Sequence, residues 1–281
     1  MKKYGYAGII ILLLIGVGYR AGHHDSKTTF LTEPAGRIVA LGDSVAAGVG
    51  LKDASDSSAC DRTNQAYSYV AAKALNLSLT SVACSQATLA EGVLGSQTVN
   101  QLAEPTQLEA LFAVKQPDVI TLTIGANDAG WIQAFGKCYT GICGTDADTT
   151  LVNARLSKVT TNIATTIQMI NDHYTGMKPM VLVTGYYQIF PETLTTGCSD
   201  ETGIDASELA WVRAQVTAIS TAVKTGLPAA NNVKFVQPDF TGHELCSKEP
   251  WVQGVADAQP YHPTADGQKS IAILIETEVK K

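Results

Sequence analysis

The sequence has few charged residues and no basic cluster. Only 16% of its 281 residues are Asp, Glu, Lys or Arg, and the 26 acidic residues are dispersed among 20 basic ones. Without a positively charged patch to neutralise phosphates, nucleic acid is not expected as a partner. With 45% hydrophobic residues, the chain can bury a large core, which argues against a disordered protein.

No internal repeat, low-complexity tract or break in composition interrupts the chain after residue 36, so we predict a single domain over residues 37–281. The segment before it is different. Two lysines precede an apolar run from Tyr4 to Tyr19, which is the pattern of a secretory signal. We therefore predict a signal peptide or an amino-terminal membrane anchor at residues 1–20, and a polar linker at residues 21–36.

Two features that would decide between a cleaved signal and an anchor are missing. No clean small-x-small cleavage site follows the apolar run, and the run is slightly short for a membrane span of about 20 residues. No cysteine lies near it, which excludes a lipid-modified amino terminus. The protein is therefore expected outside the cell, either secreted or anchored by this segment.

No two of the six cysteines have Cys-x-x-Cys spacing, so a metal site is not expected. Six cysteines behind an export signal instead predict three disulfides. The sequence alone leaves their connectivity open, and the simplest pairing is sequential. Its bonds are Cys60–Cys84, Cys138–Cys143 and Cys198–Cys246.

Apolar, strand-like runs alternate with longer helix-compatible stretches, which predicts a parallel sheet with helices on both faces. The predicted strands are Ile38–Leu41, Leu77–Ala83, Val119–Ile124, Met180–Thr184 and Val233–Val236. The predicted helices are Ala66–Leu75, Thr106–Lys115, Thr150–His173, Ala206–Thr225 and Thr264–Lys280. The residues expected to cap helix starts are Thr149, Thr150 and Asp205, and those expected to end helices are Gly176 and Gly226.

Ser44 follows the first predicted strand, where an apolar run gives way to a Gly-Asp-Ser turn and then to small residues. A strand that ends in a glycine turn and passes into a helix presents its serine at the carboxyl edge of a sheet. The N–H groups that begin the helix lie beside such a serine and can stabilise an oxyanion. An ordinary turn and cap would give the same three residues, so both interpretations stay open on this segment alone.

Two later residues can complete a site around Ser44. Asn127 follows the third predicted strand, and parallel neighbours end at the same edge, so its amide can serve as an oxyanion donor. An Asx turn is the alternative for Asn127. His262 precedes a proline in a rigid turn and is the best candidate base by elimination. The other histidines lie in the export segment, in a helical stretch and near a predicted disulfide, and they are His23, His24, His173 and His243.

Taken together, the segments Gly42-Asp43-Ser44, Gly125-x-Asn127-Asp128 and His262-Pro263, in this chain order, resemble the SGNH (GDSL-type) hydrolase family. Further similarity over Ala83–Thr88 and Cys246–Val252 indicates its secreted, three-disulfide lipase and esterase branch. The resemblance implies a flavodoxin-like α/β/α sandwich with a five-stranded parallel sheet. It also implies ester hydrolysis without a metal or other cofactor. Ser44 would be the nucleophile and His262 the base, with an oxyanion hole formed by the Ser44 N–H, the Asn127 amide and a second-loop N–H.

The chain departs from the family pattern at two positions. Gln86 stands where the second loop usually has glycine. Its N–H can serve if its φ is negative, or its side chain can narrow the pocket. Gln259 stands where an aspartate usually precedes the histidine. The imidazole still needs an acceptor to hold its tautomer, and we expect the Gln259 carbonyl in preference to the Asp257 carboxylate.

The predicted function is that of a secreted serine esterase or lipase acting through an acyl-enzyme. An O-acyltransferase would use the same residues, and a non-catalytic binding protein could have kept the fold. Absence of a long apolar lid favours soluble or short-chain esters. The expected partner is a small-molecule or lipid ester, membrane contact is expected only through the amino-terminal segment, and the protein is expected to be a monomer. Aromatic residues compatible with an acyl groove, several of which could simply pack, are Trp131, Phe135, Tyr186, Tyr187, Phe190 and Trp251.

Overall fold

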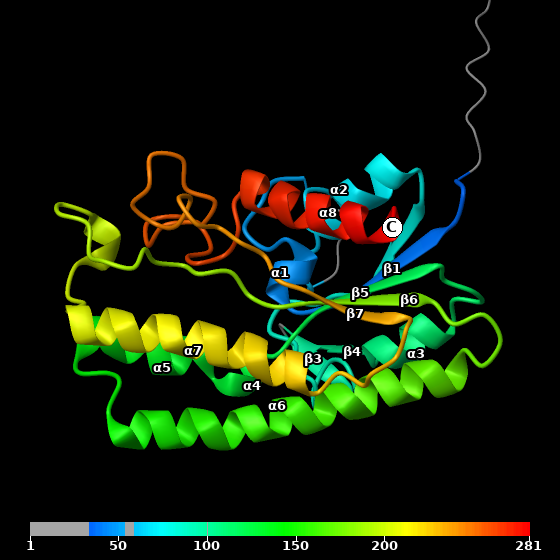
Figure 1. The fold of residues 1–281 in the computed structure, drawn as a ribbon, viewed down its shortest axis with the longest axis horizontal. Coiled ribbons are helices and arrows are strands. Elements are labelled where there is room, and N and C mark those ends of the chain that lie inside the picture. Colours follow the sequence, from blue (N-terminus) through cyan, green and yellow to red (C-terminus); the bar gives the residue numbers. More distant parts are fainter. Residues whose placement is uncertain (1–33, 54–58, 100) are drawn as a thin grey trace, which may run out of the picture. The chain divides into compact units, whose positions relative to one another are not determined.

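Five parallel strands form the central sheet in the spatial order β2-β1-β5-β6-β7 (Figure 1). The structure is a computed structural model that describes residues 34–53, 59–99 and 101–281. The predicted signal or anchor, and the linker up to residue 33, lie outside the described residues. The strands are β1 (Arg37–Gly42), β2 (Ser78–Ser81), β5 (Val119–Thr123), β6 (Met180–Thr184) and β7 (Val233–Val236).

This strand order confirms the flavodoxin-like prediction. Counted along the chain, the sheet strands lie in the order second, first, third, fourth, fifth, which is a doubly wound sheet. In such a sheet the connections leave in opposite directions between the first and third strands, here β1 and β5, and ligands bind outside the carboxyl ends at that point. Every residue of β5 is buried, as expected for a central strand covered on both faces.

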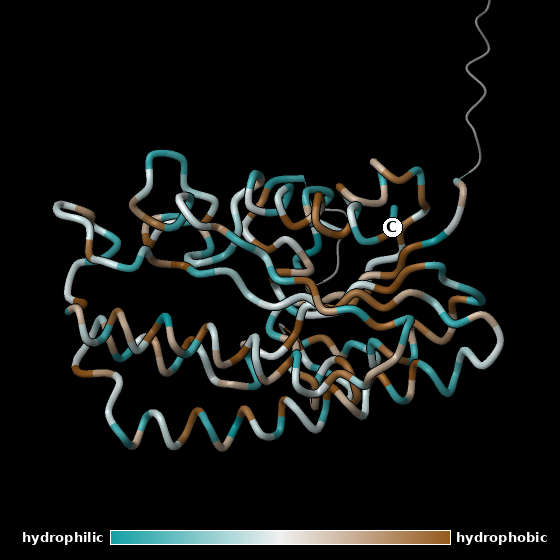
Figure 2. Tube along the Cα trace, in the orientation of Figure 1, coloured by the Kyte–Doolittle hydropathy of each residue, from teal (hydrophilic) through white to brown (hydrophobic). Residues whose placement is uncertain are grey.

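Helices cover both faces of the sheet, which gives the predicted three layers (Figure 1). One face carries α1 (Ser44–Ala47), α2 (Tyr67–Leu75) and α8 (Ala265–Val279). The other carries α3 (Gln107–Phe112), α4 (Ala126–Ala129), α5 (Trp131–Thr140), α6 (Asp146–His173) and α7 (Ala206–Thr225). The sheet strands are the most continuously hydrophobic part of the trace in Figure 2. None of the described helices is both long and apolar enough to cross a membrane.

A buried glutamine fixes the first helical layer. Gln268 of α8 accepts a hydrogen bond from the Tyr67 N–H through Oε1 (2.8 Å) and donates to the Val45 carbonyl through Nε2 (2.9 Å). Its side chain is fully buried, so these bonds satisfy its polar atoms away from water. The contact positions α8, and therefore the loop that precedes it, against the short helix α1.

Several predicted boundaries need correction. The helix predicted from Thr150 begins at Asp146, because Thr145 and Asp148 form a reciprocal capping box, so the caps predicted at Thr149 and Thr150 are wrong. The helix also ends at His173 with Tyr174 as its C-cap, before Gly176. Asp205 and Gly226 cap α7 as predicted. The edge strand predicted over Leu77–Ala83 shrinks to β2, and α1 is the helix expected directly after the Gly-Asp-Ser turn. The elements that the sequence analysis missed are α4, α5, β3 (Gln97–Val99), β4 (Leu102–Glu104) and the 3₁₀ turn η1 (Ser199–Glu201).

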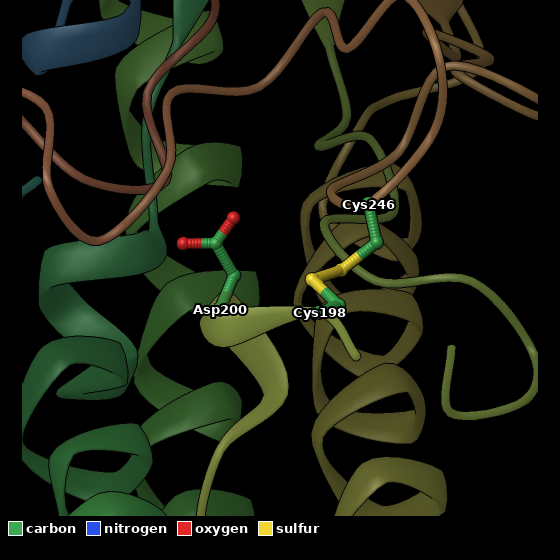
Figure 3. Close-up of side chains that lie close together, drawn as sticks. All are labelled: Cys198, Asp200 and Cys246. Atoms are coloured by element: carbon green, nitrogen blue, oxygen red, sulfur yellow. A yellow bond between two sulfur atoms is a disulfide. The ribbon is translucent and has the colours of Figure 1, made fainter. Parts of the chain in front are cut away.

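All six cysteines form disulfides in the sequential pairing. Cys60–Cys84 joins the segment after α1 to the loop after β2, and Cys198–Cys246 joins the segments after β6 and β7. Among the described residues, the metal-compatible cluster is Cys198, Asp200 and Cys246 (Figure 3). Both sulfurs are in a disulfide, and metal ligation requires thiolates, so this group does not supply a metal site. Asp200 instead accepts a hydrogen bond from the Val255 N–H (2.8 Å).

Candidate active site

Ser44 lies at the point where β1 ends and α1 begins. Gly42 has a φ of +133°, and a Cβ there would meet the Thr123 carbonyl oxygen at 2.1 Å, so the turn requires glycine. The buried side chain of Gln107 holds both the N–H and the carbonyl of Gly42, at 2.7 and 2.9 Å. Asp43 then caps α1 by accepting from the Val45 N–H (2.9 Å). These contacts place Ser44 at the carboxyl edge of the sheet.

His262 lies in the loop between β7 and α8, opposite Ser44. The loop is held by two backbone hydrogen bonds, from Gln253 N–H to the His262 carbonyl and from Tyr261 N–H to the Gln253 carbonyl, both 2.8 Å. His262 Nε2 lies 2.8 Å from Ser44 Oγ. The two residues are 218 positions apart in sequence, so the fold brings together the serine and histidine selected from the sequence.

Backbone carbonyls surround the other ring nitrogen of His262. Nδ1 lies 3.1 Å from the Pro260 oxygen and 3.3 Å from the Gln259 oxygen. A carbonyl can only accept, so Nδ1 carries the proton and the neutral ring presents its Nε2 lone pair to Ser44. Asp257 is positioned differently, because its carboxylate accepts from the Gly254 N–H at 2.7 Å. The Pro260 carbonyl is a contact that the sequence analysis did not anticipate.

Burial lowers the pKa of His262 below its ordinary value of 6.5, although the hydrogen bonds to Pro260 and Gln259 oppose part of this shift. Desolvation disfavours the charged imidazolium, whereas an acceptor at Nδ1 favours it. The net direction keeps His262 neutral over more of the pH range. A neutral imidazole is the form that can accept a proton from a hydroxyl.

The three residues expected to supply oxyanion donors, Ser44, Gln86 and Asn127, line one cavity. As the first residue of α1, Ser44 has a backbone N–H without an acceptor inside the helix. Asn127 follows the neighbouring strand β5; one of its amide hydrogens goes to the Ala87 carbonyl (2.9 Å), and its side chain lines the same cavity as Ser44. Gln86 lines this cavity too. Its φ is +64°, so the negative φ considered for it is wrong, and its backbone has the left-handed conformation that glycine adopts at no cost.

Tyr186, which follows β6, connects the segments that carry Ser44 and Asn127. Its hydroxyl donates to the Asp43 carboxylate and accepts from the Ala126 N–H at 3.0 Å. Burial raises the pKa of Asp43 to about 7, and the hydrogen bonds from Tyr186 and Val45 limit that rise. Asp128 supports the same edge, because both its carboxylate oxygens accept from the Leu89 N–H (3.0 Å). Burial raises the pKa of Asp128 to about 6.

A cavity of about 440 Å³ opens above Ser44 and His262. Both polar and large apolar side chains line it, which is typical of a pocket for a small molecule with an apolar part. Besides Ser44, Gln86, Asn127 and His262, its lining includes Asp61, Ser85, Trp131, Ile132, Tyr187, Ile189, Val216, Ile219, Gln259 and Tyr261.

Comparison with known proteins is consistent with this geometry. The pattern of the GDSL-like Lipase/Acylhydrolase family matches residues 40–269. Lipase 1 of Streptomyces coelicolor is 31% identical over 290 residues, which cover 95% of this chain and 96% of that protein. The chain belongs to the GDSL-like lipase/acylhydrolase family. It is a GDSL hydrolase of the lipase and esterase type, and so a carboxylic ester hydrolase.

Two solved structures of bacterial lipolytic enzymes have a similar fold. An extracellular lipase from Streptomyces rimosus is 27% identical with a TM-score of 0.63, over 86% of this chain and 99% of that one. A phospholipase A1 from Streptomyces albidoflavus NA297 is 26% identical with a TM-score of 0.65, over 88% of this chain and 99% of that one.

In this GDSL hydrolase, the aromatic residues expected near an acyl groove divide into two groups. Trp131, Tyr186 and Tyr187 line the cavity, whereas Phe135 and Phe190 are almost fully buried and pack behind it with ring centroids 5.5 Å apart. Trp251 lies elsewhere and stacks on His243 at 3.8 Å. The aliphatic lining from α7, Val216 and Ile219, was missed, because the inner face of an amphipathic helix has the same sequence pattern whether it meets a core or a cavity.

Proposed function

We propose that this hydrolase cleaves carboxylic esters through an acyl-enzyme on Ser44, with His262 as general base and then general acid. The 2.8 Å contact between Ser44 Oγ and His262 Nε2 is the observation that supports the pairing. His262 takes the hydroxyl proton as Oγ bonds to the ester carbonyl carbon. It then returns that proton to the oxygen of the departing alcohol. Water repeats the sequence on the acyl-enzyme and releases the carboxylic acid.

The tetrahedral intermediate carries a negative oxygen, which in this proposal is stabilised by the Ser44 N–H, the Asn127 amide and the Gln86 N–H. The left-handed backbone of Gln86 is one that the glycine usual at this position adopts without cost, so we include its N–H although its φ is positive. Each such donor is worth roughly 3–4 kcal/mol to the transition state at comparable sites. The Pro260 and Gln259 carbonyls take the orienting place usually filled by an aspartate. They hold the productive tautomer without requiring a particular side chain.

We further propose that the protein works outside the cell. Three disulfides support this, since such bonds persist in oxidising compartments. The similar lipase from Streptomyces rimosus is extracellular, and the basic and apolar start of this chain has the pattern of an export signal. Both a cleaved signal and an uncleaved anchor are compatible with this location.

The proposal is tested by Ser44→Ala, measured with a soluble nitrophenyl ester and by labelling with a fluorophosphonate. We expect the wild type to incorporate one label on Ser44, and the variant to take up none and to lose at least about 10⁴-fold in turnover. Circular dichroism checks that the variant is folded. If the folded variant kept more than about a hundredth of the activity, Ser44 would not be the nucleophile.

A further inference from the structure

The cavity above Ser44 has two chemically different walls. Asp61, Ser85 and Gln86 form the polar wall, and they come from the segments that follow β1 and β2. The apolar wall comes from the elements that follow β5 and β6, and it consists of Trp131, Ile132, Ile189, Val216 and Ile219. Because the strand order is β2-β1-β5-β6, these walls lie on opposite sides of Ser44 and Asn127.

The polar wall is fixed by covalent and backbone contacts. The Cys60–Cys84 disulfide brings the two segments to a Cα separation of 4.2 Å, and the Ser85 N–H donates to the Cys60 carbonyl at 3.1 Å. Asp61 and Gln86 flank this disulfide, and both have left-handed backbones with φ of +56° and +64°. Such conformations are uncommon outside glycine and persist where surrounding structure holds them, often at ligand sites.

The described lining of the cavity contains acidic side chains but no lysine or arginine. Its charged or titratable lining residues, among those that the structure describes, are Asp43, Asp61, Tyr186, Tyr187, Tyr261 and His262, and none is a lysine or arginine. Asp43 is a buried residue, whereas Asp61 is an exposed one. The neighbouring Arg62 does not line the cavity, and its Nη1 donates to the Ala83 carbonyl at 3.0 Å. Phosphate groups are usually recognised by lysine or arginine, so the polar wall is a poor site for an anion.

We propose that the polar wall receives the alcohol half of the ester, and that Asp61 makes the enzyme select neutral polyol or cationic alcohols over anionic ones. This inference rests on the proposed function, because Ser44 must divide the substrate into an acyl half and an alcohol half. The apolar wall accommodates the acyl half by burying its methylene groups. Ser85 and Gln86 offer hydrogen bonds to hydroxyls of the alcohol, and the Asp61 carboxylate repels a phosphate placed near the scissile bond.

The test compares three esters that share a butyryl group and differ in the charge of the alcohol: butyrylcholine, glycerol monobutyrate and monobutyryl glycerol phosphate. For the wild type at about 10 mM salt, we expect kcat/KM for the cationic ester to exceed that for the anionic ester by roughly tenfold. In about 1 M salt the difference should shrink, because screening weakens an exposed charge.

Asp61→Asn is the decisive variant, because asparagine also tolerates a left-handed backbone. It should lower the ratio of cationic to anionic kcat/KM by about fivefold, within the range for exposed charge pairs. Glu91→Gln is the matched control, since Glu91 is exposed on the same loop as Gln86 but does not line the cavity. Its ratio should equal that of the wild type.

An unchanged ratio in Asp61→Asn, or a wild type that hydrolyses the three esters equally, would overturn the alcohol-side assignment while leaving the Ser44 mechanism intact. If none of the three esters is hydrolysed while the nitrophenyl ester is, the alcohol-side assignment is overturned and the Ser44 mechanism stands. If the nitrophenyl ester is not hydrolysed either, both proposals are overturned.

Discussion

The two walls of the cavity are held in place by different physical means. The polar wall depends on the Cys60–Cys84 disulfide and on left-handed residues beside it. The apolar wall depends on packing of α5 and α7, whose inner residues continue into the core around Phe135 and Phe190. The packed helix face holds the shape of the apolar wall through many weak contacts, whereas the disulfide-bonded loop holds a few polar atoms in place. Ser44 and Asn127 lie between the two walls, so their positions depend on the disulfide-bonded loop and on the packed helices.

The largest effect on the site is expected from Tyr186→Phe. This change removes the hydroxyl that connects the segments carrying Ser44 and Asn127. The variant leaves the Ala126 N–H unpaired and takes a donor from buried Asp43, at a cost of about 1–3 kcal/mol in the free energy of unfolding. We expect kcat to fall roughly tenfold to a hundredfold with little change in KM, because small displacements of reacting groups are costly. Steady-state kinetics and urea unfolding measure the two effects.

Tyr174→Phe is the matched control for that prediction. Tyr174 is also buried, and its hydroxyl donates to the Leu111 and Val114 carbonyls at 2.9 and 3.0 Å, next to the C-terminus of α6. Its loss should destabilise the protein by a similar amount and leave kcat unchanged. Equal losses of kcat in the two variants would show that Tyr186 acts only through overall stability.

A smaller effect is expected from removing single disulfides. Comparing two of them tests whether the polar wall depends on its disulfide more than the apolar wall does. Cys60–Cys84 closes a span of 24 residues and Cys138–Cys143 one of 5. By loop-closure entropy alone, the double serine variant of the first pair should lose about 1.4 kcal/mol more stability than that of the second. The first variant should also lose several-fold in kcat/KM, since Asp61 and Gln86 are no longer held.

The second disulfide variant, at Cys138 and Cys143, should keep wild-type kinetics. None of residues 137–144 lines the cavity, whereas Asp61 and Gln86, beside the first disulfide, both do. Thermal unfolding and ester hydrolysis by both variants give the comparison. Equal losses of kcat/KM in the two variants would mean that the Cys60–Cys84 disulfide has no special role at the active site.

The sequence predicted the features that depend on local pattern. The turn from β1 to Ser44 was readable because an apolar β-branched run stops at a glycine turn, and β6, β7 and α7 have their predicted bounds. His262 was found by elimination, and it reaches Ser44 because α8, which follows its loop, is held against α1 by Gln268. These features repeat the alternation of strands and helices that specifies a parallel sheet.

Other features depend on tertiary contacts and could not be predicted. The left-handed φ of Gln86 is imposed by its surroundings, since glutamine has no intrinsic preference for it. The Pro260 carbonyl reaches His262 because of the loop's conformation. The capping box at Thr145 does not match the usual sequence pattern, because its partner Asp148 stands where glutamate or glutamine is normally found.

We propose that Ser44 and His262 act as a pair in which backbone carbonyls orient the histidine. The most direct test is the pH dependence of kcat/KM for the wild type and for Asp257→Asn. Because burial lowers the pKa of His262, activity should fall on acidification only below pH 6.5, when His262 becomes protonated. We expect this acid limb in both proteins, and values of kcat/KM within about tenfold of each other. A loss of about 10⁴-fold in Asp257→Asn, the cost of replacing a true triad aspartate, would contradict this proposal.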